Sequence, residues 1–86
     1  MSIATEVQAQ HLVDIIVNTK PVRIEGPKAT GLQIKEAAIA QGVKIQLSFQ
    51  LSEKLGDHKT KVIGDADTVT LHEGAVFAAV ADDDNS

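Results

Sequence analysis

The sequence predicts an α+β fold in which a mixed sheet of four to five strands packs on one helix. Two β-branched runs flank a short polar turn, one amphipathic segment follows with helix start and stop signals, and the later runs alternate apolar and polar residues. The chain has 86 residues, which is room for one domain, and its hydrophobic fraction of 43% is typical of a globular protein.

The first two runs predict a β-hairpin. The segment from His11 to Asn18 is expected to be a strand, and residues 18–21 a turn, because Asn tolerates positive φ and Pro cannot donate to a central ladder. The returning strand ends at Gly26 and Pro27. Val13, Ile15 and Val17 fall on one face of the first strand, and Val22 and Ile24 form the short returning strand.

A helix of about eleven residues is predicted next. Thr30 is a suitable N-cap, and Gln33 three residues later completes a capping box. Gly42 fits the left-handed position that stops a helix. The expected apolar face comprises Leu32, Ile34, Ala37, Ala38 and Ile39, and the side chains expected to face solvent are Lys35, Glu36 and Gln41.

The second half of the chain predicts the remaining strands. The cleanest period-2 alternation covers residues 45–51, and a more exposed strand returns over residues 59–63. Residues 68–71 are expected to hold a very short strand or turn, and residues 75–80 a final strand around Phe77. The order ββ-α-β(β)-β lets the last strand lie beside the first, which is the β-grasp roll.

Three parts of the chain are expected. Residues 1–10 are predicted to be a flexible N-terminal segment, residues 11–80 the folded domain, and residues 81–86 an acidic tail. The N-terminus lacks the basic and apolar stretches of a secretion signal, and no apolar run approaches the roughly 20 residues that span a bilayer. Since the chain also has no cysteine, a cytoplasmic protein is the simplest interpretation.

Charge and composition argue against nucleic acid as a partner and against catalysis. The net charge of −4 repels phosphates, and Phe49 and Phe77 are the chain's only aromatic residues apart from histidine. The three histidines stand far apart, and an adjacent pair on a strand points to opposite faces, so we expect no metal site. With no nucleophile elbow and no phosphate-binding loop, we expect neither catalytic residues nor a cofactor, hence no enzyme.

Two stretches carry a resemblance to a known family. The stretch IIVNTKPVRIEGPKATGLQIKEAA, residues 15–38, is similar to the start of bacterial multi-ubiquitin domain proteins, in which a V-N-G-x-P-V hairpin precedes a T-G that opens the helix. The stretch DADTVTLHEGAVFAAV, residues 65–80, resembles their acidic loop, short V-x-L segment and closing G-x-x-F strand. The resemblance covers nearly all of residues 11–80 and implies a ubiquitin-like β-grasp fold.

The resemblance also implies a function and partners. Family members are encoded beside homologues of ubiquitin-activating and conjugating enzymes and JAMM-type proteases, so it implies a bacterial modifier attached to a protein target through its C-terminus. The sequence departs from many relatives in carrying a single copy, and Thr19 replaces the usual turn glycine. Like many relatives, it has no terminal Gly-Gly.

One candidate site is the sheet face opposite the helix. If Val13 and its alternate neighbours face the core, Leu12 and Ile16 face solvent, near Ala78 and Val80 on the paired last strand. An apolar patch on a sheet often marks a protein-binding face. Scattered surface aliphatic residues are also normal, and the two interpretations carry about equal weight.

The other candidate site is the C-terminal tail, including Val80, Ala81 and Asp82. Small residues suit entry into the narrow channel of an activating enzyme, but three consecutive aspartates place negative charge beside an incoming nucleotide phosphate. The acidic end is therefore either trimmed first or an ordinary solubilising tail. The resemblance favours trimming, with Ala81 as the expected new terminus.

Three functions remain open at this point. The leading hypothesis is a ubiquitin-like modifier that partner enzymes activate and conjugate through its C-terminus, processed where necessary. The alternative is a non-conjugated β-grasp adaptor that binds protein partners through its sheet face. A sulfur carrier would share the fold but needs the terminal Gly-Gly that this chain lacks.

Overall fold

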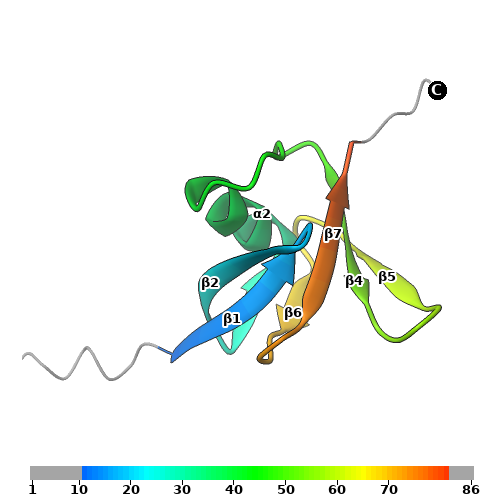
Figure 1. Cartoon of the computed structure of the whole chain (residues 1–86), viewed down its shortest axis with the longest axis horizontal. Coiled ribbons are helices and arrows are strands. Elements are labelled where there is room, and N and C mark those ends of the chain that lie inside the picture. The colour runs from blue at the N-terminus through cyan, green and yellow to red at the C-terminus, as the bar shows by residue number, and fades with distance from the viewer. Residues whose placement is uncertain (1–10, 82–86) are drawn as a thin grey trace, which may run out of the picture.

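The computed structural model describes residues 11–81, in which a five-stranded mixed sheet packs against one helix (Figure 1). The predicted N-terminal segment, residues 1–10, and the acidic tail from Asp82 onward lie outside the described residues. The elements in chain order are β1 (His11–Val17), β2 (Lys20–Gly26), β3 (Lys28–Thr30), α2 (Gly31–Ala40), β4 (Gln50–Lys54), β5 (Thr60–Ile63), β6 (Thr68–Thr70) and β7 (Val76–Val80).

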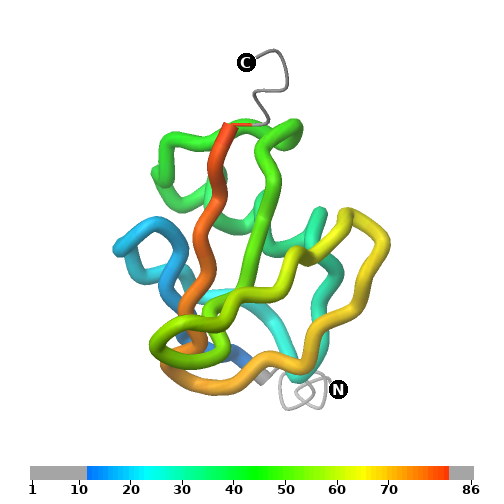
Figure 2. The backbone as a smooth tube through the Cα atoms, turned by 90° about the vertical axis from the view of Figure 1, so that its right-hand side faces the viewer, coloured from blue at the N-terminus to red at the C-terminus, as the bar shows by residue number. Residues whose placement is uncertain are grey.

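The main sheet has the strand order β2-β1-β7-β4-β5. β1 and β7 run parallel, with Val17 opposite Phe77, and each of the other neighbouring pairs is antiparallel. The last strand therefore lies beside the first, as the sequence predicts (Figure 2). A mixed sheet of this order covered on one face by α2 is the predicted α+β, ubiquitin-like β-grasp fold.

The first hairpin is closed by a turn of two residues. Asn18 and Thr19 both have positive φ, at 52° and 69°, which is the signature of the type I′ turn that matches the twist of two-residue hairpins. The turn is shorter than the predicted one, because β2 already begins at Lys20. Pro21 thus lies within β2, where it is tolerated because β2 is at the edge of the sheet.

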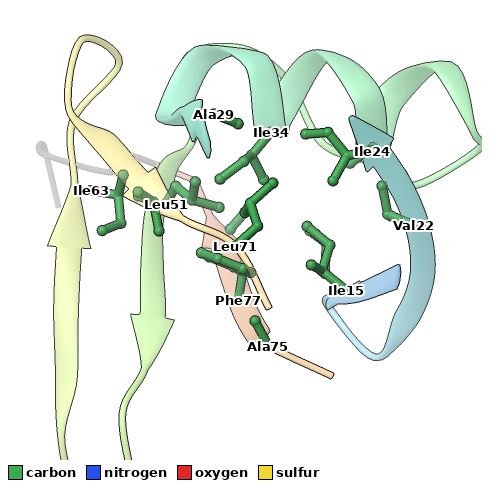
Figure 3. Close-up of a cluster of buried hydrophobic side chains, with 14 of the residues drawn as sticks. Ile15, Val22, Ile24, Ala29, Ile34, Leu51, Ile63, Leu71, Ala75 and Phe77 are labelled. Atoms are coloured by element: carbon green, nitrogen blue, oxygen red, sulfur yellow. The ribbon is translucent and has the colours of Figure 1, made fainter. Parts of the chain in front are cut away.

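The core lies between the inner face of the sheet and α2. Phe77 is 1% exposed and shares this cluster with Ile15, Ile34 and Leu51, each of which is completely buried (Figure 3). Val13, Ile15 and Val17, which the sequence places on one face of β1, are all buried, and so are Val22 and Ile24 of β2. The period-2 pattern therefore predicted correctly which face of the first strand is buried.

Helix α2 begins and ends as predicted. The hydroxyl of Thr30 accepts from the backbone N–H of Gln33, and the Gln33 side chain accepts from the Thr30 N–H at 2.8 Å. Gly42 follows the helix with φ of 99°, the left-handed conformation that glycine adopts without strain. Of the predicted apolar face, Ile39 differs, since it is 38% exposed.

The loop between β5 and β6 packs on the start of α2. The Gly31 N–H donates to the Asp67 carbonyl at 3.1 Å, and the Leu32 N–H donates to the Asp65 carbonyl at 3.2 Å. These bonds satisfy two of the four N–H groups that a helix start leaves without an intrahelical partner. After this loop, β6 pairs with β3 in a small second sheet, where the sequence predicted a short strand or turn.

The predicted strand over residues 45–51 is wrong in its first part. β4 begins only at Gln50, and residues 43–49 are a loop in which the Phe49 N–H donates to the Gln46 carbonyl at 3.0 Å. Ile45 is buried and Phe49 partly buried, whereas Leu47 is 44% exposed. The apolar spacing arises because the side chains of Ile45 and Phe49 both pack on the core from this loop. A loop of this kind can show the same alternation in sequence as a strand.

The predicted solvent exposure of Lys35 is also wrong. The side chain is buried, and its ammonium Nζ donates to the carbonyl oxygens of Leu47 at 2.6 Å and Phe49 at 2.8 Å. It also forms an ion pair of 2.7 Å with Asp65. A lysine ammonium has three N–H donors, and these three acceptors match them, which makes burial of the charge tolerable.

Candidate functional site

The outer face of the main sheet, turned away from α2, contains the predicted partner-binding residues. Because strand side chains alternate between faces, the buried positions of β1 and β7 place Leu12, Ile16, Ala78 and Val80 on this side. Leu12 is 49% exposed and Val80 55% exposed, while Ile16 and Ala78 are half-buried. All four predicted residues therefore present some surface on the expected face.

The parallel pairing of β1 and β7 brings Ile16 directly opposite Val76. On its other side Ile16 faces Pro21 of β2, and Ala78 follows Val76 on the outer face of β7. We call Pro21, Ile16, Val76 and Ala78 the apolar stripe. It crosses three adjacent strands, so its side chains lie close enough to make one contact surface.

Leu12 and Val80 lie outside the apolar stripe, at opposite ends of the face. Leu12 precedes Ile16 by four residues and Val80 follows Val76 by four, so each lies about 13 Å from the centre in opposite directions. The sequence also missed Val76 and Pro21. Val76 alternates with Ala78 and Val80, so the sequence pattern could have assigned it to the outer face. Pro21 could be placed opposite Ile16 only once the turn was known to have two residues.

An open surface hollow of about 680 Å³ lies along the β1–β2 side of this face. Its lining includes Leu12, Ile16, Pro21 and Arg23. Leu12 thus shares a concave surface with two members of the apolar stripe, although it is distant from Val76. Concavity with apolar lining residues is typical of surfaces that bind a partner.

Charged residues border the apolar stripe on the β1–β2 side. Asp14 and Arg23 face each other across the two strands and form an exposed ion pair of 2.9 Å. The hydrogen bond to Asp14 and the charge of that carboxylate raise the pKa of the Arg23 guanidinium. On the β4 side, Lys54 lies opposite Val76. An apolar centre with a charged margin is the usual composition of a protein–protein contact surface.

The tail site begins at the end of β7. This strand lies between β1 and β4 and ends at Val80 (Figure 1). Val80 and Ala81 are exposed. Asp82, the third predicted tail residue, lies outside the described residues.

The amide side chain of Asn18 holds this end of β7. Its Nδ2 donates to the carbonyl of Ala79 at 2.9 Å, and its Oδ1 accepts from the N–H of Ala79 at 2.8 Å. Sequence reasoning assigned Asn18 only to the turn. No local signal could identify its partner, because the two residues are 61 positions apart.

The histidines do not gather into a site in the part of the chain that the structure describes. His58 and His72 are exposed, and His72 lies 3.9 Å from the carboxylate of Glu53. The side chain of His11 is outside the described structure. Across residues 11–81 no three His, Cys, Asp or Glu side chains are grouped so as to hold a metal ion, and no helix has the length and apolar character to cross a membrane.

The comparison with protein families identifies the fold family directly. The family model described as Multiubiquitin matches residues 13–83, which includes the helix and every strand of the described structure except the first two residues of β1. Neither the curated proteins nor the solved structures contain a match to the chain. Because the matched segment covers most of the sequence and the strand order is that of a β-grasp roll, the chain belongs to the multiubiquitin family.

Proposed function

We propose that this protein is a ubiquitin-like modifier that is activated and conjugated through its C-terminus. In this role it is a substrate of enzymes and not itself a catalyst. Its proposed partners are ubiquitin-activating-like and conjugating-like enzymes, with a JAMM-type protease for processing. Membership of the multiubiquitin family supports the proposal.

The observation that carries the proposal is the position of the C-terminal strand. β7 is paired on both sides and contributes the buried Phe77, yet it ends at the exposed Val80 and is followed by the exposed Ala81. A carboxylate can enter a narrow enzyme channel only on a slim segment that leaves the fold. A firmly paired strand lets the fold stay intact while its terminus is handled.

The aspartates at residues 82–84 are a physical reason for removing the tail before activation. Adenylation places a nucleotide phosphate beside the terminal carboxylate, and a run of aspartates there adds repulsion. Removal of residues 82–86 by the protease would leave Ala81 as the terminus and eliminate this repulsion. Processing thus precedes activation in the proposed order.

The test is ATP–pyrophosphate exchange catalysed by the proposed partner, a ubiquitin-activating-like enzyme. Three forms are compared, namely the full-length chain, a chain ending at Ala81 with a free carboxylate, and the same chain with a terminal amide. We expect exchange with the free-acid form, less with the full-length chain, and none with the amide, which cannot be adenylated. Absence of exchange with every form overturns the proposal.

A second candidate function is a non-conjugated adaptor that binds protein partners through the sheet. The apolar stripe favours it, because Ile16 and Val76 lie directly opposite each other on the outer face. In an adaptor, the double change Ile16→Ser with Val76→Ser should weaken binding to its protein partner at least tenfold, whether or not ATP and an activating enzyme are present. The matched control is Leu47→Ser with Leu55→Ser, which changes two exposed leucines in loops outside the sheet.

The two candidates differ in what binding requires. If the protein is an adaptor, its full-length and amidated forms bind the partner equally well, and only changes in the apolar stripe weaken that binding. A modifier loses its reaction when the terminal carboxylate is blocked. Equal binding by both double variants would remove the support that the apolar stripe lends to the adaptor.

A further inference from the structure

Asn18 stands where β1 stops and β7 continues. The last rungs of the β1–β7 ladder are the bonds from the Ile16 N–H to the Ala75 carbonyl at 2.8 Å and from the Asn18 N–H to the Phe77 carbonyl at 3.1 Å. A parallel ladder of this kind is evenly spaced, so the next rung would engage Ala79. The main chain cannot supply it, because the positive φ of Asn18 and Thr19 turns the backbone towards β2.

The Asn18 side chain supplies the missing rung. Its amide carries a donor and an acceptor side by side, like a peptide group, and it bonds both the carbonyl and the N–H of Ala79. Ala79 is 3% exposed, so without Asn18 both of its backbone groups would lose their partner in a largely dry position. The contact therefore extends the pairing of β7 beyond the end of β1.

The exposure of the neighbouring residues locates the end of the paired strand. Val80 still lies opposite Gln50, the first residue of β4, but it is 55% exposed. Ala81 is the first residue after β7. Ala79 is thus the last residue of β7 held from the β1 side, and that hold is a side chain and not the main chain.

We propose that Asn18 is a positioning residue that determines where the C-terminal segment leaves the sheet. With the Asn18–Ala79 contact formed, the segment that can enter an enzyme begins at Ala81. Loss of the contact leaves Ala79 and Val80 held only from the β4 side. These two residues then fray from the end of β7 more readily, which lengthens the accessible segment by about 7 Å when they do. The consequence for processing and activation rests on the proposed function, whereas the position of the boundary does not.

Amide hydrogen exchange of the full chain tests the contact itself. Asn18→Gly is the informative change, because glycine tolerates the φ of 52° and only the amide is lost. We expect the Ala79 amide to exchange about tenfold faster or more, with Val13 and Ile15 unchanged. Asn18→Asp keeps the acceptor for the Ala79 N–H and loses only the donor to the Ala79 carbonyl, so its Ala79 amide should exchange more slowly than that of Asn18→Gly.

Digestion with a broad-specificity carboxypeptidase tests the boundary. Intact-mass measurement should show the original chain trimmed to a product that ends at Ala81 or Val80, and the Asn18→Gly chain trimmed further. Thr19→Gly is the matched control, because it changes the same turn without touching β7, and its product should equal that of the original chain.

Either of two results overturns the proposal. One is unchanged Ala79 exchange in the Asn18 variants, and the other is an identical digestion product with and without the amide. Neither experiment uses an activating enzyme, so a failure here is distinct from a failure of the proposed modifier function.

Discussion

Lys35 and Asp65 form an ion pair of 2.7 Å in which the lysine side chain is 4% exposed and the aspartate side chain 57% exposed. The same ammonium bonds two carbonyls of the loop after the helix. Lys35 therefore ties α2 to both loops that flank β4 and β5. Because its side chain is buried by these contacts, Lys35 is inaccessible to a modifying enzyme in the folded protein.

Lys35→Met should lower the free energy of unfolding by about 1–3 kcal/mol, chiefly because part-buried carbonyls lose their donor. The change keeps an apolar stem of similar length but removes every donor, which leaves two carbonyls and a carboxylate without their partner. Denaturant unfolding measures the effect, and Lys44→Met at an exposed position is the control. Equal midpoints for the two variants would show that the buried ammonium contributes nothing.

Gly31→Ala should destabilise the protein although it replaces glycine by alanine in a helix. A Cβ at Gly31 would stand 2.3 Å from the carbonyl oxygen of Gly64, so the loop that packs on the start of α2 must move. We expect a cost of about 1–3 kcal/mol from this overpacking. Gly56→Ala, where nothing lies within 4 Å of the new Cβ, should leave the unfolding midpoint almost unchanged.

Thr19→Gly should stabilise the protein by about 0.5–1.5 kcal/mol. A β-branched residue at φ of 69° is strained, and glycine at this position of a type I′ turn removes the strain. The hydroxyl of Thr19 donates to the Asn18 carbonyl, and loss of this exposed bond offsets part of the gain. A thermal melt that shows a lower midpoint for the variant contradicts the expectation.

Phe77→Ala should cost roughly 3–5 kcal/mol, a large part of the 5–15 kcal/mol that stabilises a typical domain. Phe77 is the largest of the fully buried side chains and lies on the central strand. Val76→Ala, at the partly exposed preceding position, should cost about 1 kcal/mol or less. If the Phe77→Ala protein had the same melting midpoint as the original chain, the assignment of β7 to the core would be wrong.

Local patterns in the sequence predicted most of the elements because those elements are built from neighbouring residues. The capping box of Thr30 and Gln33, the stop at Gly42 and the alternation of Val13, Ile15 and Val17 all act within a few positions. The same alternation identified the outer-face residues Leu12 and Ile16. Each of these features keeps its meaning whichever way the distant parts of the chain fold.

The tertiary structure alone decided the contacts between distant residues. Nothing local marks Lys35 as buried, since its acceptors at Leu47, Phe49 and Asp65 come from two separate loops. The same loop contacts turned the alternating residues 45–49 into a loop instead of a strand. Likewise, the sequence identifies Asn18 only as a turn residue. Its second role, as the hydrogen-bond partner of the Ala79 backbone, exists only because β7 lies beside β1. A polar group can be identified as buried and satisfied only once its acceptors are in place, because its own sequence neighbours do not contain them.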